Sequence, residues 1–191
     1  CMTDSSQHLP LSYAQQRLWF LHNMEGPGAL YTIPITLRLD GDLDADALEQ
    51  SLADVIARHD SLRTIFPETG SVVYQQVLDA GAFELQRDLD LSLAGAANTA
   101  IDIGREIPIR AWLFRRHANR HILLILLHHI AADGWSMGPL VRDLMKAYTA
   151  RRRGESPQFV ALPVQYADYT LWQREILGDE KDPASLMAQQ L

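Results

Sequence analysis

The residues of this sequence that could do chemistry are concentrated in residues 128–136, which read His-His-Ile-Ala-Ala-Asp-Gly-Trp-Ser. Neighbouring side chains on a strand point to opposite faces, so His128 and His129 cannot share one task. One of them is expected to support the fold. The other is expected to face a substrate, where an imidazole can accept or donate a proton near neutral pH. Asp133 and Gly134 then form a tight turn, in which the carboxylate can hold the loop or pair with an arginine.

Three other interpretations of these residues have to be weighed against proton transfer. A histidine near a strand end is more often a hydrogen-bonded scaffold residue than a catalyst. A metal site needs convergent ligands, and two histidines on opposite faces do not supply them, so no metal is expected. A serine hydrolase is disfavoured because the sequence has no Gly-x-Ser-x-Gly segment and Ser136 stands where a helix cap is expected. A histidine acting on a substrate proton without a covalent intermediate remains.

The elements around this stretch are predicted to hold it rigidly. Residues 121–127 are almost uniformly hydrophobic, which is typical of a strand covered on both faces and predicts the central strand of a sheet. Ser136 then opens a helix whose apolar residues recur at helical spacing as far as Tyr148. Loops that follow such strands carry sites in α/β proteins because the scaffold presents them in a fixed position.

The rest of the sequence mixes helical and β patterns, which predicts an α/β fold: a mixed sheet with flanking helices. Pro34 inside the first strand indicates an edge position, and the turn formers in residues 67–70 predict a hairpin. Helices are expected at residues 12–24, 44–59, 94–104, 136–153 and 165–177, with the start of another at 183–191. Strands are expected at residues 31–39, 62–66, 72–78, 109–116 and 121–127, and residues 83–89 are expected to continue the meander after the hairpin.

Composition and charge exclude several classes of protein. The 191 residues are 47% hydrophobic and 21% charged, which suits a globular domain and not a disordered chain. A net charge of −7 without a Lys/Arg stripe argues against nucleic-acid binding. The longest aliphatic run is far below the ~18 residues that span a bilayer, so a cytoplasmic protein without membrane contact is expected. Cys1 is the sole cysteine and precedes Met2, which suggests a scar before the native start and leaves no internal disulfide.

Residues 128–134 resemble the His-His-x-x-x-Asp-Gly signature of nonribosomal peptide synthetase condensation domains, which are related to chloramphenicol acetyltransferases. Three further segments resemble motifs of this family in the same order, at residues 11–19, 58–66 and 166–172. The signature alone is shared with acyltransferases and epimerisation domains, whereas four collinear motifs are specific. The sequence of residues 131–136 is also similar to the subclass that accepts a donor ending in a D-residue.

The resemblance implies amide-bond formation between two thioesters, a donor peptidyl and an acceptor aminoacyl group, each carried on the phosphopantetheine arm of a carrier protein. No bound cofactor is implied. His129 resembles the residue placed against the acceptor amine, where it removes the amine proton or orients the amine. The resemblance assigns supporting roles to His128, Asp133, Gly134, Arg63 and Arg58, and substrate contact to Trp135 and Ser136.

Within this resemblance, His128 corresponds to the buried structural neighbour of His129. Asp133 corresponds to the carboxylate that holds the loop, with Arg63 as the favoured partner and Arg58 as the alternative. Gly134 corresponds to the small residue that lets the thioester approach. The aromatic segment at residues 166–172 is expected to pack in the core or between lobes and not to contact substrate.

A complete family member has two similar lobes with the active site between them. Residues 9–178 are expected to form the N-terminal lobe, after a scar and disordered lead at residues 1–8 and before a truncated helix at 179–191. The lobe alone is expected to be inactive. Its implied partners are carrier proteins, the C-terminal lobe and adjacent synthetase domains. Two other functions stay open: a non-catalytic lobe that docks a carrier protein, and an epimerisation-type or acyltransferase relative.

Overall fold

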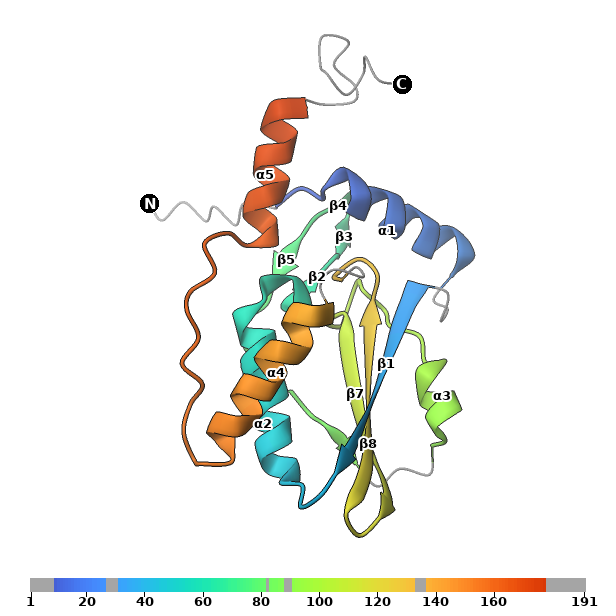
Figure 1. The fold of residues 1–191 in the computed structure, drawn as a ribbon. Coiled ribbons are helices and arrows are strands. Elements are labelled where there is room, and N and C mark those ends of the chain that lie inside the picture. Colours follow the sequence, from blue (N-terminus) through green and yellow to red (C-terminus); the bar gives the residue numbers. More distant parts are fainter. Residues whose placement is uncertain (1–8, 27–30, 82, 88–90, 133–136, 178–191) are drawn as a thin grey trace.

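The computed structural model describes residues 9–26, 31–81, 83–87, 91–132 and 137–177. Its main sheet has four strands in the order β1-β8-β7-β6 (Figure 1). β1 (Thr32–Asp40) and β7 (Ile109–His117) pair antiparallel with β8 (Arg120–His128), and β6 (Gln86–Arg87) pairs parallel with β7. Among the described strands, β8 lies inside the sheet and β1 at its edge. The apolar run of β8 and Pro34 in β1 predicted these positions.

Helices cover both faces of the main sheet. α2 (Ala45–Arg58) and α4 (Met137–Arg151) lie side by side on one face, and the short α3 (Leu93–Ala97) lies on the other (Figure 1). Alternate residues of β8 enter the two cores: Leu123, Ile125 and Leu127 pack with α2 and α4, and Leu124 and Leu126 pack on the α3 side. The predicted mixed α/β class, with a mixed sheet and flanking helices, is confirmed.

Helix caps fix where two helices begin. Ser12 caps α1 (Tyr13–Glu25) through a reciprocal pair of bonds: its Oγ accepts from the backbone N of Gln15 at 3.1 Å, and its own N donates to Gln15 Oε1 at 2.8 Å. Asp44 caps α2 by accepting from the backbone N of Ala47 at 2.9 Å. α1 crosses the end of the sheet at which β8 finishes (Figure 1).

The hairpin forms, but its turn is displaced from the predicted one. β2 (Thr64–Ile65) pairs with β5 (Gln76–Val77), and β3 (Glu68–Thr69) pairs with β4 (Val72–Val73). The turn therefore lies at Gly70 and Ser71, whose φ angles of +60° and +80° are those of a two-residue hairpin turn, and not at residues 67–70. A 3₁₀ turn, η2 (Asp60–Arg63), precedes β2.

Two other predictions about the β and helical segments are wrong. Residues 83–87, the described part of the segment 83–89, do not continue the meander, because β6 pairs with β7 at the far edge of the main sheet and Leu85 before it is buried in the core. The helix expected at 94–104 ends at Ala97. Beyond it, Asn98 Nδ2 donates to the carbonyl of Ala94 at 2.8 Å, and Ile101 and Ile103 are buried in the core.

α5 (Tyr166–Leu177) carries the aromatic segment, and its burial differs from the expectation. Thr170 is fully buried, but Tyr169 and Trp172 are 42% and 57% exposed, so these two side chains do not pack in the core of this chain, and their packing between lobes stays a prediction. No helix in the described part of the chain is long and apolar enough to cross a membrane. The expected lead at residues 1–8, the Ser136 cap and the helix at 183–191 lie outside the described residues.

Candidate active site

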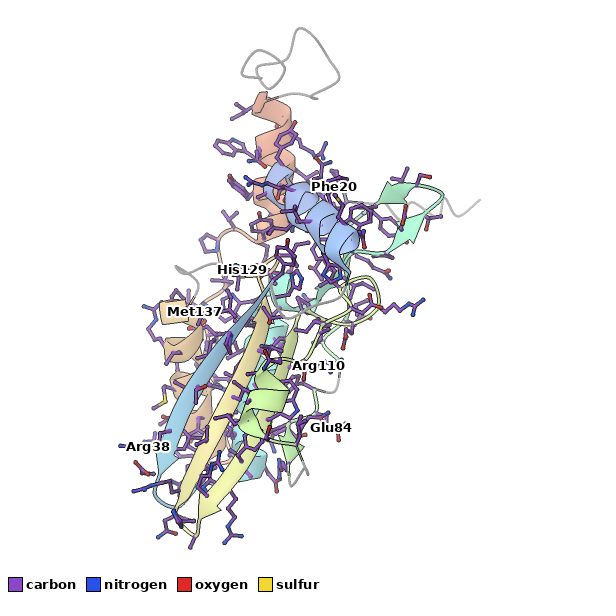
Figure 2. All side chains as sticks on the ribbon, turned by 90° about the vertical axis from the view of Figure 1, so that its right-hand side faces the viewer. Phe20, Arg38, Glu84, Arg110, His129 and Met137 are labelled. Carbon is purple, nitrogen blue, oxygen red and sulfur yellow. The ribbon has the colours of Figure 1, made fainter. Side chains whose placement is uncertain are left out.

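The last residues of β8 are held by both neighbouring segments. The backbone N of His128 donates to the carbonyl of Pro108 at 2.9 Å, and that of His129 donates to the carbonyl of Tyr31 at 2.8 Å. The central strand thus stays hydrogen-bonded up to the residue predicted to act on substrate. In Figure 2 His129 lies at the end of the sheet next to α1, and Arg38 marks the opposite end.

The two adjacent histidines have opposite environments, as strand alternation predicts. His128 has no exposed surface, whereas the side chain of His129 is exposed. Nδ1 of His128 accepts a hydrogen bond from the backbone N of Ile130 at 3.1 Å, and its Nε2 lies 3.3 Å from Nδ1 of His22 on α1. Burial, with smaller effects of His22 and His129, lowers the pKa of His128 to about 4. His128 is therefore uncharged at neutral pH.

His129 lines a pocket of about 360 Å³ between segments that are distant in sequence. Its walls come from α1, from η2, from the turn after β8 and from the first residue of α5. The lining residues are Ala14, Gln15, Leu18, Ser61, His129, Ile130, Ala131, Ala132 and Tyr166. The pocket thus combines a mostly apolar wall with an imidazole and two hydroxyl groups, a composition suited to an organic substrate.

A buried polar network holds the α1 and α5 walls of this pocket together. Gln15 Nε2 donates to Gln75 Oε1 at 3.2 Å, and Gln75 Nε2 donates to the carbonyl of Pro10 at 2.8 Å. The hydroxyls of Ser12 and Tyr166 lie 3.0 Å apart. The sequence did not predict Tyr166 as a pocket residue or Gln75 as a residue that supports the pocket wall. The one local signal was the polar pair Gln75 and Gln76 inside the β-prone run of residues 72–78.

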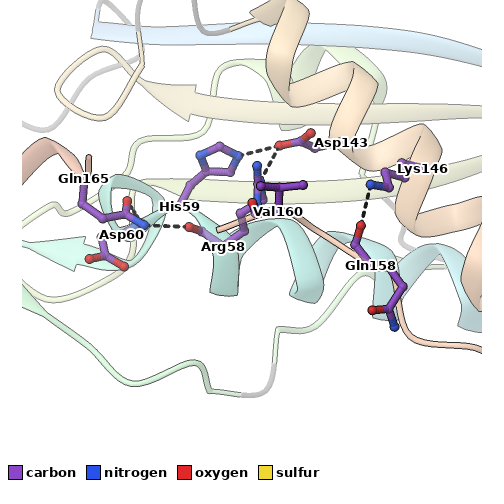
Figure 3. Close-up of polar contacts among 8 residues, drawn as sticks. All are labelled: Arg58, His59, Asp60, Asp143, Lys146, Gln158, Val160 and Gln165. Carbon is purple, nitrogen blue, oxygen red and sulfur yellow. Dashed lines mark hydrogen bonds and ion pairs between the residues drawn. The ribbon is translucent and has the colours of Figure 1, made fainter. Parts of the chain in front are cut away.

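Both arginines with predicted supporting roles have carboxylate partners in the described structure. Arg63 pairs with Asp60 and also donates to the carbonyl of Leu78. Arg58 Nε lies 3.0 Å from Asp143 Oδ2 on α4, so its described carboxylate partner is Asp143 (Figure 3).

Asp143 joins several segments of the chain. His59 Nε2 lies 2.9 Å from the same carboxylate oxygen that Arg58 contacts. The guanidinium of Arg58 also lies 4.7 Å from the centre of the Phe159 ring. Gln165, next to Tyr166 of the pocket, donates from Nε2 to the carbonyl of Arg58 at 3.1 Å (Figure 3). This cluster fixes the segment that leads into α5.

Four predicted site residues, Asp133, Gly134, Trp135 and Ser136, lie outside the described residues. The pairing of Asp133 with Arg63 or Arg58 therefore stays a prediction. Within the described ranges, no group of three or more histidine, cysteine or acidic residues could hold a metal ion.

The lowered pKa of His128 predicts acid-dependent stability. The unfolded chain binds a proton at this imidazole below about pH 6.5, but the folded chain does so only below about pH 4. Protons in this window therefore favour unfolding, and stability is lost as the pH falls from about 6.5 to about 4, by up to about 3 kcal/mol. The pKa of His22 is also lowered by burial, so His22 also contributes to the loss of folding stability as the pH falls.

Urea unfolding at several values between pH 7 and about 4.5 checks this prediction. The variant His128→Asn removes the titrating ring, so its free energy of unfolding is expected to change less over the same range than that of the wild type. Equal losses in the two proteins would show that His128 does not carry the acid sensitivity.

Comparisons with known proteins agree with this fold. The family described as "Condensation domain" matches residues 5–184. The chain is 54% identical over 189 residues to a protein of Salinispora arenicola named "Probable non-canonical nonribosomal peptide synthetase (NRPS) CymA", covering 96% of this chain and 2% of that protein. It is 49% identical over 196 residues to a dimodular nonribosomal peptide synthase of Bacillus subtilis, covering 98% of this chain and 8% of that protein.

Solved structures extend the comparison to three dimensions. The X-domain in complex with OxyB from teicoplanin biosynthesis superposes with a TM-score of 0.87 at 35% identity, covering 99% of this chain and 43% of that chain. The first condensation domain of the CDA synthetase shares the fold, with a TM-score of 0.74. The chain thus spans less than half of these solved chains and a small part of the synthetases. On the match of residues 5–184 and these relatives, the chain belongs to the condensation-domain family of nonribosomal peptide synthetases.

Proposed function

We propose that this chain is the N-terminal lobe of a condensation domain that joins a donor peptidyl thioester to an acceptor aminoacyl thioester. The observation that supports this proposal is the placement of His129. Its side chain is exposed at the end of a rigid buried strand and lines the pocket. A histidine presented in this way can accept a hydrogen bond from an attacking amine without forming a covalent intermediate.

In the proposed reaction, the acceptor amine nitrogen attacks the carbonyl carbon of the donor thioester. The C–N bond forms, the C–S bond breaks, and the thiol of the donor phosphopantetheine leaves. The amine loses one proton and the leaving thiolate gains one, so the step is balanced without another reactant. His129 accepts the hydrogen bond of the amine, and much of the rate arises from holding the two thioesters in attack geometry.

The remaining family roles are part of this proposal. Asp133 holds the loop through Arg63, Gly134 gives the thioester room, and Trp135 and Ser136 contact substrate. One observation on Arg63 supports the first role: its Nε is buried and has no hydrogen-bond partner among the described residues. A buried donor of this kind calls for an acceptor, and we assign that acceptor to Asp133, which lies outside the described residues.

We also propose that residues 9–178 constitute one lobe and that a second lobe completes the substrate tunnel. This chain covers 43% of the length of the X-domain chain, which supports a division into two lobes. The partners are then carrier proteins, the second lobe and adjacent synthetase domains. The resemblance of residues 131–136 to the D-donor subclass assigns the donor a terminal D-residue.

A transfer assay with the intact domain and both loaded carrier proteins tests the proposed function. Mass spectrometry is expected to find the amide product on the acceptor carrier protein. A donor with an inverted α-carbon and no amide product would instead show an epimerisation-type relative. An L-terminal donor that reacts as fast as the D-terminal donor would overturn the donor assignment alone.

A second candidate function is a docking module without condensation activity. The solved structure with a TM-score of 0.87 is an X-domain in complex with another protein, OxyB, and this observation favours the candidate. The transfer assay separates the two. A docking module would form a complex of defined stoichiometry with a carrier protein or with another protein of the assembly. It would yield no amide.

Without a second lobe, we expect this chain to self-associate and to form no peptide. Large apolar side chains on α1 and α5 are exposed, and an apolar surface in water promotes association. They are Phe20, Met24, Leu171, Trp172 and Ile176. Sedimentation velocity over a concentration series is expected to show growing oligomers, and the double variant Leu171→Gln, Trp172→Gln is expected to show fewer.

Val160 is a matched control because it is 80% exposed on a different segment. The variant Val160→Gln is expected to associate like the wild type. A monomer at every concentration, or repeated turnover by the chain alone, would be incompatible with its being half of a domain.

A further inference from the structure

The buried pair formed by His22 and His128 has no role in the function proposed above. Their side chains come from α1 and the end of β8, and their residues are 5% and 0% exposed. The rings meet edge to face with centres 5.2 Å apart, and Nε2 of His128 lies 3.3 Å from Nδ1 of His22. Two histidines buried in contact need a defined arrangement of protons, because an unmatched donor or acceptor is costly there.

The backbone around His128 shows which arrangement is present. The N–H of Ile130 points at Nδ1 of His128 at 3.1 Å, so this nitrogen is an acceptor and carries no proton. In an uncharged imidazole the proton then lies on Nε2, which makes His128 the donor toward His22. Nδ1 of His22 is therefore the acceptor, and the proton of His22 lies on its own Nε2.

The same hydrogen bonds shape the turn that carries His129. The backbone N of Ala131 donates to the carbonyl of His128 at 3.0 Å, and the backbone N of Ile130 donates to its ring. His128 thus closes the turn through both its backbone and its side chain. The opposite tautomer would place its Nδ1 proton against the N–H of Ile130 and open the turn beside His129.

The buried surroundings of the pair also favour an uncharged His22. Burial lowers the pKa of His22, and the carboxylate of Asp102 opposes this effect only in part. An uncharged His22 keeps a lone pair on Nδ1, which the hydrogen bond from His128 requires.

We propose that His22 is a positioning residue for the catalytic turn: its Nδ1 accepts the Nε2 proton of His128, fixes His128 in one tautomer and so holds the turn that presents His129 to the pocket. The consequence for the reaction rests on the proposed function of His129, whereas the consequence for the tautomer does not. An apolar side chain at position 22 would fill the space but leave the Nε2 proton of His128 without an acceptor.

Nitrogen NMR of the chain with labelled histidine tests the tautomer directly. The variant His128→Gln identifies the His128 signals among those of the seven histidines. The wild type is expected to show one tautomer, with the proton on Nε2. In His22→Leu we expect a mixture of tautomers and amide exchange at Ile130 at least tenfold faster than in the wild type.

His22→Asn is the matched variant, because its Oδ1 stands as many bonds from Cα as Nδ1 of histidine does and also accepts a hydrogen bond. It is expected to keep the single tautomer and the slow exchange. If His22→Leu does not fold, His22→Phe keeps a ring of similar size without an acceptor and is interpreted in the same way. A single Nε2 tautomer with unchanged exchange in the Leu or Phe variant would overturn the proposal.

Activity of the intact domain gives the second measurement. His22→Leu is expected to lower kcat at least tenfold with little change in the KM of either thioester, and His22→Asn is expected to stay within threefold of the wild type. Equal loss in both variants would overturn the positioning role. If the wild type forms no amide, the proposed function fails, and the tautomer measurement still decides the role of His22.

Discussion

His129→Ala is expected to slow amide formation in the intact domain by about 100-fold or more. Removing a positioned acid–base group costs this much in other enzymes, which corresponds to a barrier increase of about 2.7 kcal/mol. Folding is expected to be unchanged, because the side chain of His129 is exposed at the pocket. Single-turnover transfer between two loaded carrier proteins measures the rate without interference from product release.

His117→Ala is the matched control, since His117 is an exposed histidine on β7 of the same sheet, near the end away from the pocket. Its transfer rate is expected to equal that of the wild type. A second variant, His129→Gln, accepts a hydrogen bond but takes up no proton. Activity near that of the wild type in this variant would assign His129 to orienting the amine, whereas a loss like that of His129→Ala would assign it to proton removal. A rate within twofold of the wild type for His129→Ala would remove the residue from the mechanism.

Asp143→Ala is expected to cost about 3 kcal/mol of folding stability. The Asp143 side chain is 13% exposed and accepts from Arg58 and His59, which are 15% and 22% exposed. Breaking a largely buried pair by removing one partner leaves an uncompensated cation, and such changes cost about 3–5 kcal/mol. In the variant, the carbonyl of Val160 and the ring of Phe159 still contact Arg58. We therefore expect a loss of stability at the lower end of this range.

Asp54→Ala is the comparison for this loss, because Asp54 pairs with Arg151 and also joins α2 to α4. That pair is more exposed, at 25% for Arg151 and 18% for Asp54, and involves two side chains where the Asp143 cluster involves three. We expect Asp54→Ala to cost about 1 kcal/mol in urea unfolding. A smaller loss for Asp143→Ala than for Asp54→Ala would contradict the view that Asp143 is the principal link among α2, α4 and the segment before α5.

Features that depend on residues close together in the chain were determined by the sequence alone. The apolar run at residues 121–127 predicted an inner strand, and the adjacency of His128 and His129 predicted one buried and one exposed ring. The helices predicted from residues 12 and 44 do begin there, because Ser12 and Asp44 each cap a backbone group only three residues away. Strand alternation and helix capping are local rules, so a single sequence contains the information they need.

Local rules were wrong where the rest of the fold competed with them. Residues 94–104 have a helical composition, but Ile101 and Ile103 are buried in the core and the helix ends at Ala97. Residues 86 and 87 have a β pattern, but their parallel partner is β7 and not the preceding hairpin. In both segments burial of apolar side chains against distant elements outweighs the local preference.

Only the tertiary structure decided which polar groups meet. Arg58 was assigned to the loop of residues 128–136 as an alternative partner of Asp133, and it contacts Asp143, 85 positions away. His22 appeared as one polar residue of a helix until the fold brought it against His128, 106 positions away. A polar group that becomes buried must pair with whatever partner the packed elements bring beside it. That partner depends on how strands and helices assemble, and the periodicity of a single segment does not predict it.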